Sequence, residues 1–173
     1  MTKKRILIAG VGNIFLKDDG FATEVIKRLS EREPREGVEI HDFGTGGLKL
    51  AYDLLKGYDA LILIDAARRG EPPGTLYLIE PNYDEIPSEL TEGGPIDPHG
   101  ADTGTVLRFV KGLGAWPAKI IIVGCEPTAV DDFEIGLSGP VRAAVDGAMK
   151  LVEDTMQEIL TGKTEVEYEH AGR

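Results

Sequence analysis

The sequence predicts a three-layer α/β fold in which helices flank a twisted, mostly parallel sheet of five strands. Short apolar runs rich in isoleucine at residues 6–9, 61–64 and 120–123 are typical of strands that are covered on both faces. Residues 38–40 and 76–79 are weaker strand candidates. Helical patterns lie between these runs, and such an alternation of strands and helices favours a parallel sheet with helices on both sides.

Apolar residues spaced three, four or seven positions apart indicate helices that each bury one stripe. Three helices are predicted in this way, over residues 22–29, 48–55 and 106–113. In the second of them, the expected stripe runs through Leu48, Ala51 and Leu55. A last helix is expected to begin after Ser138 as its N-cap, with Pro140 in its first turn, and to pack across the sheet.

The length of 173 residues and the apolar content of 42% predict one globular domain. This single α/β domain is expected to cover residues 1–160, while residues 161–173 form a polar tail with a frayed end. Residues 81–102 contain four prolines and few periodic apolar residues. Because so long a loop is more often functional than idle, we expect a mobile cover there.

The composition excludes several classes of partner. The chain carries 19 basic and 30 acidic side chains, a net charge of −11, which argues against binding to nucleic acid or to an anionic membrane. Its longest stretch without a charged residue is eleven residues long, whereas a membrane-spanning helix needs about 20. Cys125 is the only cysteine, so no intramolecular disulfide can form, and we expect a reducing, cytoplasmic environment.

Polar residues follow several of the predicted strands, where open parallel sheets bind their ligands. Asp18 and Asp19 come after the first strand, Asp65 ends the third, and His99 lies in the long loop after the fourth. Two carboxylates and one imidazole can therefore converge on one edge of the sheet. Each residue also has a structural interpretation: either aspartate of the first pair can cap a helix, Asp65 can be buried with a polar partner, and a loop histidine is usually solvated.

Two other kinds of site are weaker alternatives. Gly10-x-Gly12 after a strand resembles the opening of a dinucleotide-binding fingerprint, with Asp42 as a ribose ligand. Phe15 stands where the third glycine is expected, and the two aspartates near the helix N-terminus would repel a pyrophosphate. Cys125 could form a dyad with the loop histidine, although a single cysteine ending a buried strand is usually a small hydrophobic residue.

Several motifs together resemble those of the maturation proteases of nickel-iron hydrogenases. The matching segments are Gly10-Val-Gly-Asn13, Asp18-Asp19-Gly20, Asp42-Phe-Gly-Thr45-Gly46-Gly47, Leu61-Ile-Leu-Ile-Asp65-Ala66, Pro98-His99 and Gly136-Leu-Ser138. The similarity extends over residues 6–160, nearly the whole chain. It implies the same twisted, largely parallel sheet between helices.

The resemblance also implies a metal site. Its ligands, which are also the expected catalytic residues, are Asp19, Asp65 and His99. One imidazole and two carboxylates suit a borderline divalent ion and leave coordination positions open for water or a substrate group. In this family the ion is thought to be the nickel already placed in the substrate, and zinc or cadmium can stand in for it.

The activity implied by the resemblance is removal of the C-terminal extension of a hydrogenase large-subunit precursor after nickel insertion, by a nickel-dependent endopeptidase. The Gly-Thr-Gly-Gly turn is associated with substrate recognition, which makes Asp42, Thr45 and Gly46 candidate substrate contacts. Two alternatives stay open at this point. The chain could be a non-enzymatic nucleotide- or flavin-binding module, or a metal-sensing chaperone of the hydrogenase.

Overall fold

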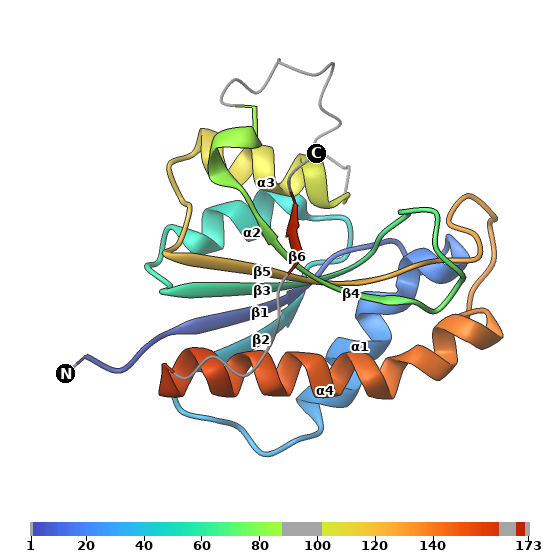
Figure 1. Ribbon diagram of the computed structural model, residues 1–173, viewed down its shortest axis with the longest axis horizontal. Coiled ribbons are helices and arrows are strands. Elements are labelled where there is room, and N and C mark those ends of the chain that lie inside the picture. The colour runs from blue at the N-terminus through green and yellow to red at the C-terminus, as the bar shows by residue number, and fades with distance from the viewer. Residues whose placement is uncertain (1, 88–101, 163–168, 172–173) are drawn as a thin grey trace.

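A computed structural model describes residues 2–87, 102–162 and 169–171 of the chain (Figure 1). The strands are β1 (Ile6–Gly10), β2 (Val38–Asp42), β3 (Ala60–Ala66), β4 (Leu76–Pro81), β5 (Lys119–Cys125) and β6 (Glu169–Ala171). They form one sheet in the order β2-β1-β3-β5-β4-β6. β2, β1, β3 and β5 pair in parallel, and β4 runs antiparallel to β5. The predicted mostly parallel sheet is confirmed.

Helices cover both faces of this sheet. The helices are α1 (Phe21–Ser30), α2 (Gly47–Leu54), α3 (Thr103–Gly112) and α4 (Gly139–Thr161), with short 3-10 turns η1 (Lys17–Gly20) and η2 (Tyr83–Glu85). α1 and α4 lie on one side of the sheet, and α2 and α3 lie on the other (Figure 1). Among the described segments, no helix combines the length and apolar character needed to cross a bilayer.

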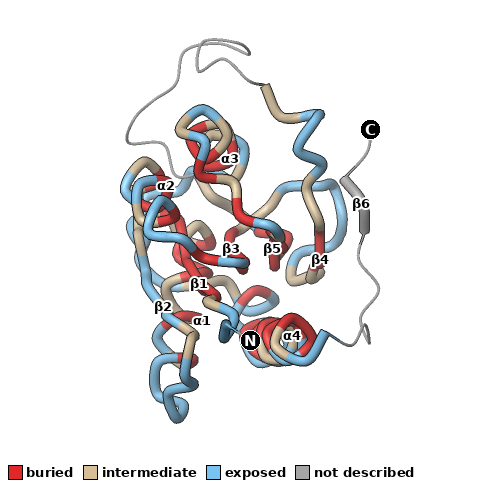
Figure 2. Tube along the Cα trace, turned by 90° about the vertical axis from the view of Figure 1, so that its left-hand side faces the viewer, coloured by how far each residue is buried: buried red, intermediate tan, exposed pale blue. Residues whose placement is uncertain are grey.

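The central strands are buried on both faces, which explains their continuous apolar runs (Figure 2). Successive side chains of a strand point to opposite faces of the sheet. In β1, Ile6 and Ile8 therefore pack in the core under α1 and α4, while Leu7 and Ala9 pack in the core under α2 and α3. The sheet thus separates two hydrophobic cores and holds its strand ends at fixed positions.

The predicted stripe of α2 is confirmed at Leu48 and Ala51, which pack in the core, and is wrong at Leu55. The helix buries Leu50, Ala51 and Leu54, whereas Leu55 follows its last residue and is 52% exposed. Both sets of spacings fit a helical repeat, so periodicity alone does not choose between them. Packing of α2 against the sheet and α3 selects the observed face.

The polar tail contributes β6, although a frayed end is expected for residues 161–173. β6 pairs in parallel with β4, from Ile79 opposite Glu169 to Pro81 opposite Ala171. Strand pairing is made by backbone groups and needs no apolar stripe, so the composition of the tail does not predict it. The long segment expected over residues 81–102 begins with η2, and its residues 88–101, His99 among them, lie outside the described part of the chain.

A buried glutamate holds the ends of β3, β4 and β5 together. Glu126 follows β5 and is only 6% exposed. It accepts hydrogen bonds from the Tyr77 hydroxyl at 2.7 Å, the Arg69 amide at 2.7 Å and the Gly70 amide at 3.1 Å. Burial raises the pKa of Glu126, but the three hydrogen bonds outweigh it, so the pKa lies below its ordinary value of 4.5.

We expect Glu126→Gln to lower the free energy of unfolding by about 1–3 kcal/mol at neutral pH, because an amide NH2 would then face buried donors. A lowered pKa in the folded state means that the ionised carboxylate stabilises the fold above pH 4.5, and that this stabilisation is lost as the pH falls through the folded-state pKa. Urea denaturation over a pH series should therefore show the difference from wild type shrinking in acid. Glu31→Gln, at an exposed position, is the matched control, and an equal effect of both changes would contradict the role of Glu126.

Candidate functional site

The loops that follow β1, β3 and β5 gather at one end of the sheet, on the right of Figure 1. A pocket of about 300 Å³ opens between them. Its lining residues are Asp19, Asp65, Ala66, Arg68, Asp102, Pro127 and Val130. The fold therefore brings two of the three expected metal ligands, Asp19 and Asp65, onto one pocket at the edge where parallel sheets bind ligands.

Asp65 is a buried carboxylate fixed to the first residue of α3. It lies near the end of β3, is 2% exposed, and its Oδ2 accepts hydrogen bonds from the amide and the hydroxyl of Thr103 at 3.1 and 2.6 Å. Burial raises the pKa of Asp65 well above its ordinary value, and the charges of Asp19 and Asp102 add to this, while the Thr103 hydrogen bonds oppose it. The ionised form of Asp65 is thus costly in the absence of a cation.

Asp19 is held in η1 by the turn that follows β1. The Asn13 amide donates to its Oδ2 at 2.8 Å. Gly12 has φ +144°, and a Cβ there would lie 2.0 Å from the Asp19 carbonyl oxygen, so only glycine permits this close approach. Burial raises the pKa of Asp19, as do the charges of Asp102 and Asp131, and the Asn13 hydrogen bond only partly offsets them.

The neighbouring Asp18 points elsewhere and is fully buried. Its carboxylate accepts hydrogen bonds from the amides of Thr128, Ala129 and Ser138 at 2.8, 3.3 and 2.7 Å, and from the Ser138 hydroxyl at 2.8 Å. These donors belong to the loop after β5 and to the start of α4. Asp18 therefore joins two segments far apart in the chain, whereas Asp19 faces the pocket.

The expected caps differ from those observed. Neither Asp18 nor Asp19 caps α1, because Gly20 occupies the N-cap position and makes no side-chain capping bond. Ser138 does occupy the N-cap of α4, with Pro140 in the first turn as predicted, but its side chain makes no capping bond to that helix. The Ser138 hydroxyl donates to Asp18 instead, because the buried carboxylate is a stronger acceptor.

Two further charged residues of the pocket were not identified from the sequence. Asp102 is the N-cap of α3 and accepts from the Thr105 amide at 3.0 Å and its hydroxyl at 2.6 Å. An aspartate just before an apolar stripe is a capping signal that could have located it. Arg68 forms an ion pair with Asp131 at 3.1 Å, and no local pattern in the sequence marks it.

The third expected metal ligand is His99, which lies outside the described residues. In the described ranges, no three His, Cys, Asp or Glu side chains are grouped closely enough to hold a metal ion by themselves. What the structure places together is a pair of carboxylates, Asp19 and Asp65, with the carboxylate of Asp102 on the same pocket.

The loop after β2 carries the residues expected to contact substrate, which are Asp42, Thr45 and Gly46. Asp42 braces this loop by accepting from the Thr23 hydroxyl at 2.8 Å and the Gly44 amide at 2.9 Å. The Gly12 amide donates to the Gly44 carbonyl at 2.9 Å, which ties the loop to the turn that holds Asp19. The loop is thus a neighbour of the carboxylate pocket but does not line it.

Two glycines of this turn are needed for different reasons. Gly44 has φ +54°, in the left-handed region that favours glycine. Gly46 has φ −88°, but a Cβ there would lie 2.9 Å from the Phe43 carbonyl oxygen. Glycine is therefore required at position 44 for its positive φ and at position 46 for space. Thr45, between them, is exposed.

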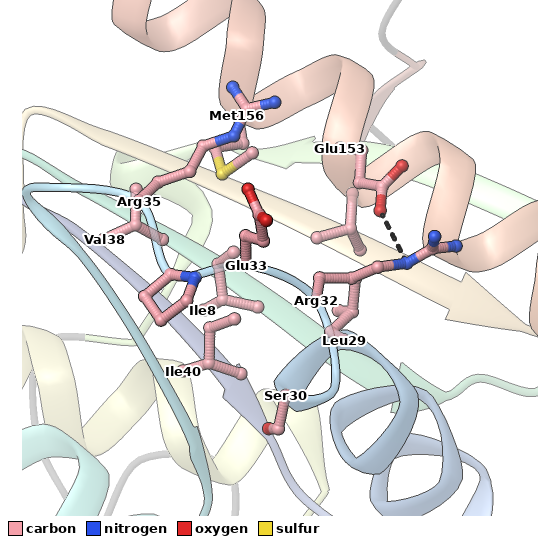
Figure 3. Close-up of a pocket in the computed structure, with 12 residues that line it drawn as sticks. Ile8, Leu29, Ser30, Arg32, Glu33, Arg35, Val38, Ile40, Glu153 and Met156 are labelled. Atoms are coloured by element: carbon pink, nitrogen blue, oxygen red, sulfur yellow. Dashed lines mark ion pairs between the residues drawn. The ribbon is translucent and has the colours of Figure 1, made fainter.

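A larger pocket, of about 500 Å³, lies away from these loops, between the end of α1, the edge strand β2 and α4 (Figure 3). Its floor includes Ile8, Ile40 and Met156, and an ion pair between Arg32 and Glu153 at 3.5 Å lies at its edge. This pocket contains neither of the two expected aspartates. We therefore place the candidate site at the smaller pocket, where the carboxylates meet.

The structure gives no support to a reactive thiol. Cys125 is fully buried in the core beneath α1 and α4. Burial raises its pKa to about 12, and the nearby charges of Asp18 and Glu126 contribute. A thiol in this environment stays protonated and packs as a small hydrophobic side chain.

Comparison with known proteins identifies relatives of this chain. Residues 23–155 match the model of a family described as hydrogenase maturation protease. The chain is 33% identical to the hydrogenase 2 maturation protease of Escherichia coli, over 89% of this chain and 92% of that protein. It is 32% identical to the hydrogenase expression/formation protein HoxM of Azotobacter vinelandii, over 91% of this chain and 75% of that one. The solved structure of the Escherichia coli hydrogenase maturating endopeptidase HybD has a TM-score of 0.73 at 32% identity and covers 90% of this chain and 93% of its own.

The two adjacent aspartates should respond differently to the same substitution. We expect Asp18→Asn to lower the free energy of unfolding by about 2 kcal/mol. The amide NH2 of asparagine would face N–H and O–H donors whose hydrogen bonds the carboxylate accepts. Asp19→Asn should leave the free energy of unfolding at pH 7 unchanged or raise it. The raised pKa of Asp19 means that its ionised form opposes folding, a cost absent below pH 3.8 and complete above the folded-state pKa. Urea denaturation of both variants tests this, and equal destabilisation would refute the division of roles.

Proposed function

Because the chain belongs to the hydrogenase maturation protease family, we propose that it is an endopeptidase that processes a nickel-iron hydrogenase large-subunit precursor. In this proposal it removes the C-terminal extension of the precursor after nickel has been inserted. The observation that carries the proposal is the meeting of Asp19 and Asp65 on one pocket at the carboxyl ends of the strands. The comparisons give no support to a nucleotide- or flavin-binding module or to a chaperone without activity.

We propose that Asp19, Asp65 and His99 together bind the nickel ion carried by the precursor. The pocket fits a cation, because burial and mutual repulsion make its carboxylates costly to ionise without one. His99 precedes Asp102, a pocket residue, by three positions, and three residues of chain span at most about 11 Å. A mixed oxygen and nitrogen ligand set suits nickel, and zinc or cadmium could substitute.

The residues of this chain supply position and charge. Bound nickel would polarise the scissile carbonyl or lower the pKa of a water molecule. Thr103 fixes the orientation of Asp65, and the Asn13 amide fixes that of Asp19, so neither carboxylate must reorganise when the ion arrives. Asp102 adds negative charge to the pocket and strengthens the attraction for a divalent ion.

We place this activity in the cytoplasm. The chain is acidic, and its only cysteine, Cys125, is buried and has no second cysteine in the chain with which to form a disulfide. The hydrogenase large-subunit precursor is the proposed partner, and the net charge of −11 gives no basis for nucleic acid as another.

The metal site predicts a defined pattern of affinities. Asp19→Asn, Asp65→Asn and His99→Ala should each weaken the binding of nickel or zinc by at least about tenfold, because each removes one ligand. Isothermal titration calorimetry of the free protein measures these affinities. Asp146→Asn, at an exposed position on α4, is the matched control and should bind like wild type. Unchanged affinity in all three site variants would rule out the metal site.

The processing step is tested with two samples of one precursor, one loaded with nickel and one metal-free. We expect the protein to shorten only the loaded sample, and intact-mass spectrometry of the large subunit reads the loss of the C-terminal peptide directly. Asp65→Asn should slow this loss by about a hundredfold or more, because a ligand to the reacting centre is gone. Equal cleavage of both samples would contradict nickel gating, and cleavage of neither sample of a cognate precursor would contradict the protease itself.

A further inference from the structure

Four large apolar side chains lie exposed together beside the carboxylate pocket. Phe133 is 85% exposed, Ile135 71%, Phe15 46% and Ile14 43%. The rings of Phe15 and Phe133 are stacked, with centroids 6.1 Å apart and an interplanar angle of 8°. We call these four residues the apolar patch. Clustered exposed apolar side chains of this size mark interaction sites more often than single exposed residues do.

The apolar patch is held in place by the backbone. Phe15 and Phe133 come from different loops, one after β1 and one after β5. The Glu134 amide donates to the Phe15 carbonyl at 2.9 Å, and the Lys17 amide donates to the Glu134 carbonyl at 2.7 Å. This pairing links the two loops like a short piece of parallel sheet. A surface ordered in advance loses less conformational entropy when a partner binds.

The same two loops reach into the carboxylate pocket. The first continues from the apolar patch into η1, which carries Asp19. The second supplies the pocket residues Pro127 and Val130, and Asp131 pairs there with Arg68. A partner seated on the apolar patch would therefore present its adjoining surface to the two carboxylates.

We propose that the apolar patch docks the folded body of the hydrogenase large-subunit precursor, an inference that rests on the proposed function. The patch lies beside the pocket, so the segment to be cut enters the pocket while the surface around it meets the patch. Asp131, Asp132 and Glu134 interleave with the patch residues and are exposed, on a chain of net charge −11. The partner surface is accordingly apolar and bordered by lysine or arginine.

The test compares two double variants of the full chain. Phe133→Gln with Ile135→Gln alters the apolar patch at exposed positions, so the fold should be retained. Tyr52→Gln with Leu55→Gln is the matched control, since it also replaces one aromatic and one aliphatic side chain, 53% and 52% exposed, on and just after α2. We expect the patch variant to bind the precursor about tenfold more weakly by biolayer interferometry. Its kcat/KM for processing should fall by a similar factor through KM, with kcat retained, while the control matches wild type.

Binding and cleavage separate the two proposals. If wild type binds the precursor without cutting it, the proposed protease function fails while docking is still measured. Equal precursor affinity for wild type and the patch variant, or no binding by wild type, overturns the docking proposal. Analytical ultracentrifugation of the protease alone tests whether a second copy of this chain occupies the apolar patch instead. If wild type is a dimer, the patch variant is a monomer and precursor affinity is unchanged, the patch serves self-association and the docking proposal is overturned.

Discussion

Four hydrogen bonds converge on the buried carboxylate of Asp18, and they join the turn after β1 to the loop after β5 and to the start of α4. Much of the functional end of the molecule depends on this junction. It fixes η1, so that the next residue, Asp19, faces the pocket, and it fixes the loop that carries Phe133. A buried carboxylate is tolerated here because amide and hydroxyl donors surround it.

Two adjacent aspartates consequently have different physical roles. Consecutive residues of a 3-10 turn point about 120° apart, so one side chain can enter the protein while the next faces the pocket. The fold supplies hydrogen-bond donors to Asp18. The pKa of Asp19 is instead raised, most by burial and further by the negative charges of Asp102 and Asp131. The first aspartate stabilises the fold, and the second stores unfavourable charge that a cation would relieve.

The sequence predicted the fold where one physical signal dominates. Double-sided burial makes β1, β3 and β5 continuous apolar runs, and all three were located. It did not predict that α2 buries Leu50 and Leu54 and leaves Leu55 exposed, which packing decides, or β6, which only backbone pairing reveals. At the site, the position of Asp65 follows from its place near the end of β3. The roles of Asp18 and Asp19 do not follow from spacing, because they depend on donors in a loop more than a hundred residues away.

In the two proposals, the precursor is recognised by two surfaces, the apolar patch and the carboxylate pocket. Contacts on the apolar patch would be the same before and after the peptide bond reacts, so they raise affinity and leave the chemical step unchanged. In the proposed function the carboxylates would respond to the charge of a metal ion, and a loaded precursor would offset the burial and the repulsion that raise the pKa of Asp65. Strong docking would therefore not compromise the discrimination between loaded and metal-free precursor, provided that cleavage depends on the pocket. On this view the burial of Asp65 is functional: the cost of its unpaired charge makes the pocket selective for a partner that already carries a cation.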